Sequence, residues 1–519
     1  MGKILPQYQK AIIEEIISAI ASNTSQYYVF AANPIAYDGN TTPTLTYDDY
    51  STSFTNDWQM LFGKKLKSTD IVPVISNKPW KANTVYNRYD NTVANLVNYY
   101  TIVPPSTVGG SYTIYKCIDN ANGSPSLYPP DQVQQQSFTK TDGYTWRYIT
   151  SISSALYNKS ATNNYAPITS NATITASAFS HSGIEVVMIN SGGVGYSCYT
   201  NGIIQSVSNS TLIQIQTNSS PDNDFYTKNG IYIYNTGSTT GQLKTIQRYV
   251  SNLTGNWVYL DSPVNTDVIV SGSNNQTQNA TKYYISPRVV FETDGDGTPA
   301  ALSYINPSSN SISSIKIIET GTGISWANVS IQSNTTYGSG ANLYAIVPPP
   351  GGHGSNPASE MGVNGFVVSF NFSNTESNTI LVTTQYNKIG LLKNPYSISQ
   401  STKNKTTAYS SNTFSSVLSA NLDFGSSIFS TGDTVIGANS GARGTVAFCN
   451  STMIYLTGDK KFISGERIIS NNGVLAANIT INTVGDIFTK DITPLYVQNI
   501  SNVIRSGNQA ESFKLIIKV

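Results

Sequence analysis

From residue 70 onward, the sequence is a succession of short apolar or aromatic runs separated by turn-forming residues. The runs at 72–75, 99–103 and 112–118 are bounded by Asn-Lys-Pro, Pro-Pro-Ser and Gly-Gly, which favour turns. Runs of this length are typical of strands and are too short for helices that bury one face. The pattern therefore predicts a mainly β chain.

One segment near the N-terminus has helical spacing instead. Its apolar residues recur every three or four positions, and they are Tyr8, Ile12, Ile16, Ala19 and Ile20. Pro6 suits a first helical turn, and the Asn-Thr-Ser at 23–25 ends the pattern. A strand is expected at 27–31. For residues 56–66, a short helix and an irregular segment anchored by Trp58 are equally compatible with the sequence.

Charged residues are unusually scarce, at 11% of 519 residues against roughly 25% in ordinary soluble domains. The net charge of +1 leaves no basic field that would attract nucleic acid or an anionic membrane. No apolar stretch is long enough for a transmembrane helix, and no export signal is recognisable. We therefore predict no nucleic-acid partner and no membrane insertion.

The residue types that carry most cofactor chemistry are few and scattered. The three cysteines, Cys117, Cys198 and Cys449, form no C-x-x-C pair. The two histidines, His181 and His353, are far apart and lie in no H-E-x-x-H motif. Zinc sites, disulfide frameworks and most histidine catalysis are poorly supported by this pattern. We predict no metal and no cofactor.

Two glycine-containing segments resemble binding loops only superficially. The Gly-Val-Gly at 193–195 lacks the third glycine and the following helix that a dinucleotide site requires. The Asp-Gly-Asp-Gly at 294–297 lacks the later ligands of an EF-hand loop. Both segments are predicted to be turns between strands.

Carbohydrate chemistry is the remaining enzymatic possibility. Glycosidases use two opposed carboxylates, and the candidates are Glu185, Glu292, Asp294 and Asp296, among which no pair is singled out. The tyrosine pairs at 27–28, 99–100 and 283–284 can stack on sugars. In a strand, however, one residue of each pair faces the core and the other faces solvent or a partner. We predict no catalytic residues.

A weak internal repeat occurs at 184–197 and 314–325. Both segments read as a strand that ends in a G-x-G turn, followed by an aromatic or apolar residue and Ser. A single shift of this size indicates duplication of a small β unit and not a regular solenoid. The Pro-Pro-Pro-Gly-Gly at 348–352 is expected to be a boundary loop. Later, three short strands within 434–456 are spaced like a small barrel or meander.

Three ordered motifs go beyond this general pattern. Residues 71–80 read I-V-P-V-I-S-N-K-P-W, residues 115–119 read Y-K-C-I-D, and residues 142–148 read D-G-Y-T-W-R-Y. In this order they resemble the dimeric baseplate wedge subunit of T-even-like contractile-tailed bacteriophages. The residues that carry the resemblance are Pro79, Trp80, Tyr115, Cys117, Asp119, Asp142, Gly143, Tyr144, Trp146 and Tyr148.

The resemblance covers roughly 4–165, 366–398 and 491–519, and it implies a multi-domain β-sandwich architecture with a short N-terminal helical segment. The implied parts are a discontinuous wedge-type β core of 1–170, 366–400 and 491–519, an inserted β region at 176–362, and a small inserted β barrel or meander at 401–490. We expect the inserted region 176–362 to be autonomous, with its two ends close together in space.

The family is architectural, so the resemblance implies no enzyme activity. It implies a homodimer that joins other wedge proteins into the six-fold baseplate of the virion tail, after assembly in the host cytoplasm. Scarce charge suits large permanent contacts. Cys117 is then a small buried hydrophobe, and Tyr144, Trp146 and Tyr148 share one strand face. The alternative is a glycan-binding or glycan-cleaving β-rich tail or surface protein.

Overall fold

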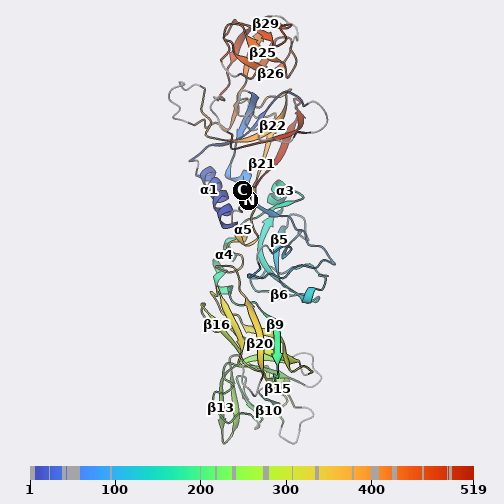
Figure 1. The fold of residues 1–519 in the computed structure, drawn as a ribbon, viewed down its shortest axis with the longest axis vertical. Coiled ribbons are helices and arrows are strands. Elements are labelled where there is room, and N and C mark those ends of the chain that lie inside the picture. Colours follow the sequence, from blue (N-terminus) through green and yellow to red (C-terminus); the bar gives the residue numbers. More distant parts are fainter. Residues whose placement is uncertain are drawn as a thin grey trace. The chain divides into compact units, whose positions relative to one another are not determined.

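The computed structural model confirms a mainly β, multi-domain chain (Figure 1). It describes residues 6–22, 24–37, 42–43, 59–93, 96–198, 200–216, 219–235, 241–272, 280–306, 308–332, 338–376, 379–398, 408–423, 429–458, 461–487, 489 and 494–518. The predicted N-terminal helix is α1 (Pro6–Ala21). The chain forms two compact units: unit 1 comprises 1–74 and 364–519, and unit 2 comprises 75–363.

The first sheet of unit 1 is built around a strand that is buried along its whole length. In order, its strands are β23 (Thr413–Ser415), β2 (Met60–Lys65), β1 (Tyr27–Ala32), β22 (Gln385–Lys393) and β30 (Tyr496–Ile504). The helix considered for 56–66 is wrong for residues 60–65, because β2 pairs with β1 on one side and β23 on the other. Trp58 lies outside the described residues.

A second sheet of unit 1 contains the last strand of the described chain. Its unit 1 strands are β31 (Ala510–Lys518), β21 (Gly365–Ser373) and β3 (Ile71–Ser76), in that order. Aromatic side chains join the two sheets: the Phe372 ring lies 5.0 Å from that of Phe62 and 6.3 Å from that of Tyr386. The sheets of unit 1 therefore share an aromatic core, as in a β-sandwich.

Unit 1 also contains a small closed barrel, which lies within the predicted range 401–490. In ladder order its strands are β24 (Leu418–Leu422), β27 (Met453–Leu456), β26 (Arg443–Cys449), β25 (Thr434–Gly437), β28 (Arg467–Ser470) and β29 (Ala476–Thr483). Alternate side chains fill the interior, including Val435, Val446 and Ile468. Closure leaves no exposed strand edge.

Unit 2 begins with a sheet that carries most of the family-like motifs. In order, its strands are β4 (Tyr100–Val103), β5 (Ser111–Asn120), β7 (Tyr144–Ser153) and β6 (Phe138–Thr139). The other short elements of the chain are η2 (Ser68–Asp70), η3 (Ala121–Gly123), α3 (Ser154–Ser160), β8 (Tyr165–Pro167), α4 (Ala172–Ser177), η4 (Phe179–His181), η5 (Thr266–Val268) and α5 (Pro357–Glu360).

The repeated sequences of unit 2 form two copies of a three-strand unit. The first copy has β9 (Val186–Val194), β16 (Val289–Thr293) and β17 (Ala300–Asn306). The second copy has β18 (Ser311–Glu319), β19 (Ala327–Ile331) and β20 (Ser339–Ile346). Strands pair between copies, as β9 with β20, β17 with β18, and β16 with β19. Neither copy buries its strands without the other, so the two copies form one module.

The two copies are related by an approximate two-fold axis. Tyr196 N donates to Asn310 O at 2.8 Å, and Ile324 N donates to Ser182 O at 3.0 Å. Each residue of one bond stands 128 positions from its counterpart in the other, the same shift as the sequence repeat. The β-bulges match as well, since the irregularity at 300/301 opposite β18 corresponds to that at 342/343 opposite β9.

A second closed barrel lies in the chain between β9 and β16. In ladder order its strands are β10 (Thr200–Asn209), β11 (Leu212–Ile215), β14 (Gly255–Leu260), β13 (Gly241–Asn252), β12 (Gly230–Tyr234) and β15 (Lys282–Ile285). Its interior is filled by its own isoleucines and tyrosines, including Ile231, Tyr249 and Tyr283. This barrel therefore has a core separate from that of the duplicated module.

The division into units differs from the predicted boundary near residue 176. Near the predicted ends of the inserted region, Thr175 Oγ1 donates to Gly354 O at 3.4 Å. Residues 75–175, however, belong to the same compact unit as 176–363. The physical reason is a set of charged side chains that joins the two segments.

Candidate functional site

The family-like motif residues form an aromatic cluster on one face of the β4–β7 sheet. Tyr144, Trp146 and Tyr148 alternate along β7, and all three are buried. Tyr115 and Cys117 on β5 are paired in register with Tyr148 and Trp146. The sequence motifs at 115–119 and 142–148 are therefore neighbouring strands that share one core.

Trp146 lies at the centre of this aromatic cluster and is fully buried. Its ring stacks on Tyr144 with centroids 5.5 Å apart and meets the edge of Tyr86 at 5.3 Å. Trp80 is half-buried, packs against the cluster and donates from Nε1 to Ser126 Oγ at 3.3 Å. Pro79 is exposed. The tryptophans are thus core residues to different degrees.

The acidic motif residues fix turns next to the cluster. Gly143 has a φ of 87°, a conformation that favours glycine. Asp142 Oδ2 accepts a hydrogen bond from Leu127 N at 2.7 Å. Asp119 Oδ1 accepts one from Ala121 N at 3.0 Å. These hydrogen bonds assign both carboxylates a structural role.

Two cations project from the opposite face of the same sheet. Lys116 and Arg147 are direct cross-strand partners on β5 and β7. Lys116 is 0% exposed and Arg147 is 5% exposed. Like charges directly opposite each other are destabilising, and burial of an unpaired charge costs far more. This pair therefore requires buried counter-ions.

The counter-ions come from the two ends of the predicted inserted region. Glu360 Oε1 lies 2.5 Å from Lys116 Nζ, and Glu185 Oε1 lies 3.0 Å from Arg147 Nη1. His353 lies between the carboxylates, with Nδ1 2.5 Å from Glu360 Oε1 and Nε2 3.6 Å from Glu185 Oε2. All five side chains are at most 7% exposed. We call these five residues the buried ion cluster.

Aromatic rings and backbone groups enclose the buried ion cluster. The Tyr89 ring centroid lies 3.8 Å from Lys116 Nζ, a cation–π contact. Glu360 Oε2 accepts a hydrogen bond from Gly354 N at 2.8 Å. Burial alone would raise the pKa of Glu360, but Lys116, His353 and the Gly354 N–H hold it well below its usual range. Glu360 is therefore a carboxylate at neutral pH.

The charges of this cluster act as a connection between segments. Lys116 and Arg147 come from the sheet, whereas Glu185 and Glu360 come from segments on either side of the barrel and the duplicated module. The opposite charges of the cluster compensate one another at little exposure to solvent. Arg147 and Glu185 also line the edge of a pocket of about 980 Å³. This arrangement explains why residues 75–175 and 176–363 form one unit.

Of the four carboxylates considered for glycan cleavage, Glu185 and Asp296 line one pocket of about 980 Å³, whereas Glu292 and Asp294 do not. Glu185 is engaged in the buried ion cluster. Asp294 Oδ1 accepts a hydrogen bond from Ser325 N at 2.9 Å. Asp296 lies in the turn between β16 and β17, and Glu292 is exposed on β16. Thus two of the four candidates already have structural partners.

The segment at 294–297 joins two strands, as predicted, whereas the prediction for 193–195 is wrong in part, because Gly193 and Val194 are the last residues of β9. Gly193 and Gly195 have φ values of 66° and 73°. Gly297 has a φ of 81° in the segment that joins β16 to β17. Positive φ at these positions explains the glycines without any ligand.

The tyrosine pairs follow the predicted alternation in two of three cases. Tyr283 is buried in the barrel core, whereas Tyr284 is half-buried on the outer face. The pair at 99–100 divides in the same way. The prediction is wrong for the pair at 27–28, where both residues are buried. The reason is that β1 is a central strand with both faces covered.

The described residues contain no group of three His, Cys, Asp or Glu side chains placed to hold a metal ion. No helix in the described ranges has the length and apolarity needed to cross a membrane. The three cysteines are free, and Cys117 is buried as predicted. Burial raises the pKa of the Cys117 thiol, which makes it a poor nucleophile.

The buried ion cluster was not predicted from the sequence, although the positions of its two cations could have indicated it. Lys116 and Arg147 each stand between aromatic or apolar residues in the middle of a strand. A charge at such a position indicates a buried partner. Glu360 and His353 lie in a short helix and a Gly-Pro-rich loop, where charged residues are ordinary, and gave no comparable signal.

No protein-family model matches this chain, and no curated protein matches it either. The resemblance to the wedge-subunit family therefore rests on the motif residues and their order.

Proposed function

We propose that this protein is a structural subunit of the baseplate wedge of a contractile phage tail. In this role it forms a homodimer and joins other wedge proteins within the virion. The observation that carries the proposal is the order of the three motifs, at 71–80, 115–119 and 142–148.

The structure supports this proposal through the environment of the motifs. The second and third motifs pair as β5 and β7, and their aromatic residues share one buried cluster. Five of the ten residues that carry the resemblance therefore contribute to one core, which suits an architectural role. The Lys116–Glu360 and Arg147–Glu185 ion pairs add a polar connection on the other face of the sheet.

Two measurements test the proposal. Mass spectrometry of purified tails should detect the protein together with other wedge proteins, and its absence from tails would contradict the proposal. Light scattering after gel filtration should give about twice the chain mass of 56.0 kDa. A clean monomer at micromolar concentration would contradict the homodimer.

A further inference from the structure

The unit 2 barrel occupies one connection of the duplicated module. In the second copy, β18 continues to β19 through the short segment 320–326. In the first copy, the equivalent strands β9 and β16 are separated by 195–288, which contain the whole barrel. The second copy shows that the module forms this connection without a barrel. The barrel has its own core and is not needed to complete the module. A role in binding would therefore involve residues on the barrel surface.

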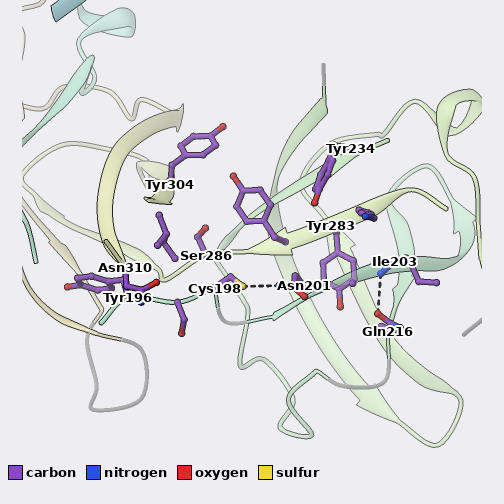
Figure 2. Close-up of a pocket in the computed structure, with 15 residues that line it drawn as sticks. Tyr196, Cys198, Asn201, Ile203, Gln216, Tyr234, Tyr283, Ser286, Tyr304 and Asn310 are labelled. Atoms are coloured by element: carbon purple, nitrogen blue, oxygen red, sulfur yellow. Dashed lines mark hydrogen bonds between the residues drawn. The ribbon is translucent and has the colours of Figure 1, made fainter. Parts of the chain in front are cut away.

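A groove of about 1050 Å³ lies where this barrel meets the duplicated module (Figure 2). The barrel contributes Tyr234, Lys282 and Tyr284, and the module contributes Tyr196, Tyr304 and Asn310. Lys282 is the one charged residue among the described residues that line the groove, and none of them is Asp or Glu. The groove is thus aromatic and polar, with a single cation.

Strand alternation explains why tyrosines line this groove. On β15, Tyr283 and Ile285 fill the barrel core, whereas Lys282 and Tyr284 face outward. Tyr284 is paired with Tyr232 on β12, and their rings are 5.6 Å apart. The outward side chains form a half-buried aromatic surface, of which Tyr284 reaches into the groove.

The two sides of the groove are connected by aromatic contact. The Tyr304 ring of the module lies 6.3 Å from the Tyr284 ring of the barrel. Burial raises the pKa of both hydroxyls, so both remain protonated and able to donate hydrogen bonds at neutral pH. Nearby, Gln216 Oε1 accepts a hydrogen bond from Ile203 N at 3.3 Å, which orients the amide (Figure 2).

We propose that this groove binds an oligosaccharide without cleaving it. Tyrosine rings offer flat apolar faces for the C–H faces of sugar rings, and hydroxyl and amide groups bond sugar hydroxyls. Cleavage by the usual route requires two opposed carboxylates, which the described lining lacks. A nucleic acid requires more cationic contacts than Lys282 alone provides.

The test uses the full-length protein on an array of immobilised neutral tetra- to octasaccharides, followed by calorimetry with the strongest binder. Tyr284→Ala and Tyr304→Ala should each weaken binding about tenfold or more, which corresponds to about 1.4 kcal/mol. Tyr259→Ala is the matched control, because Tyr259 is exposed on β14 of the same barrel and outside the groove. Thermal melts of each variant verify that the fold is retained.

A second variant deletes residues 199–288 and joins Cys198 directly to Val289, as Trp326 is followed by Ala327 in the second copy. We expect a folded protein that no longer binds the oligosaccharide. Retained binding by this variant, equal binding by the tyrosine variants, or no binding by the wild-type protein would each overturn the proposal. Release of new reducing ends would overturn binding without cleavage. These assays use purified protein, so their outcome is independent of whether the chain is found in tails.

Discussion

The buried ion cluster and the tyrosine groove show two opposite uses of polar side chains within unit 2. In the cluster, five ionisable groups are withdrawn from water and neutralise one another across distant segments. In the groove, tyrosines and amides remain at the surface with one cation among the described lining residues. The comparison indicates that the cluster stabilises the fold, whereas the groove side chains remain available to bind a ligand.

The largest effect is expected from deletions that divide the chain at different places. Replacing 176–362 with a short Gly/Ser linker removes Glu185 and Glu360 and leaves two buried cations unpaired. Each unpaired charge costs about 3–5 kcal/mol, so the remainder should fail to fold. Replacing 75–363 instead should leave unit 1 folded, because Asn364 N already donates to Val74 O at 3.3 Å.

Circular dichroism and gel filtration of the two deletion proteins decide the matter. Adding Lys116→Met and Arg147→Met to the first deletion is the matched control, and it should recover part of the lost structure. A stably folded 176–362 deletion that retains both cations would show that the cluster does not unite the two segments.

The next effect concerns the aromatic face of the same sheet. Trp146→Ala should lower the free energy of unfolding by about 3–5 kcal/mol, because a fully buried ring is removed from a packed cluster. Urea denaturation provides the measurement. Trp326→Ala is the control, since Trp326 is 49% exposed. A Trp146→Ala variant that is as stable as the control would show that the Trp146 ring does not contribute to the core.

Glu360→Gln should destabilise the protein by about 3 kcal/mol, since Lys116 then lacks its carboxylate partner. The double variant Lys116→Met with Glu360→Gln should lose less than Glu360→Gln alone, because the unpaired cation is absent. Denaturant titrations of both variants measure the difference. A double variant that is less stable than Glu360→Gln would show that Lys116 stabilises the fold even without Glu360.

The ion cluster should also give the fold a dependence on acid that the groove does not. The pKa of Glu360 is lower in the folded protein than its ordinary value, which is about 4.3. The stabilisation from the carboxylate is therefore present above this pH and is lost as the pH falls toward the folded pKa. Melting temperatures between about pH 5 and pH 3 should fall more steeply for the wild-type protein than for Glu360→Gln. Parallel curves would contradict this assignment.

The smallest effect on stability is expected in the groove. Tyr234→Ala should change the free energy of unfolding by less than about 1 kcal/mol, because the side chain is half-buried on the outer barrel face. Tyr249→Ala, from the barrel core, is the contrasting variant and should cost about 3 kcal/mol or more. Similar losses for both tyrosines would indicate that the groove face is part of the fold.

The sequence was sufficient for features that depend on local pattern. Period-two alternation predicted Trp146 and Tyr148 on one strand face, and the Asp-Gly-Asp-Gly sequence predicted the turn at 294–297. It was insufficient where the outcome depends on which strands become neighbours. Both residues of the pair at 27–28 are buried because of the strands placed around β1. In the same way, Lys116 and Glu360 are far apart in the sequence, and their ion pair depends on how the folded chain brings them together.

The position of β1 in the chain has a consequence for synthesis. β1 can pair with β2 soon after both leave the ribosome, but its other edge is completed by β22, roughly 350 residues later. At about 5–20 residues per second this takes roughly 20–70 s. During that time a Tyr-Tyr-Val-Phe-Ala-Ala edge is open to other nascent chains, a condition that favours aggregation. Yield of soluble protein should therefore depend on the rate of translation and on chaperones that cover this edge.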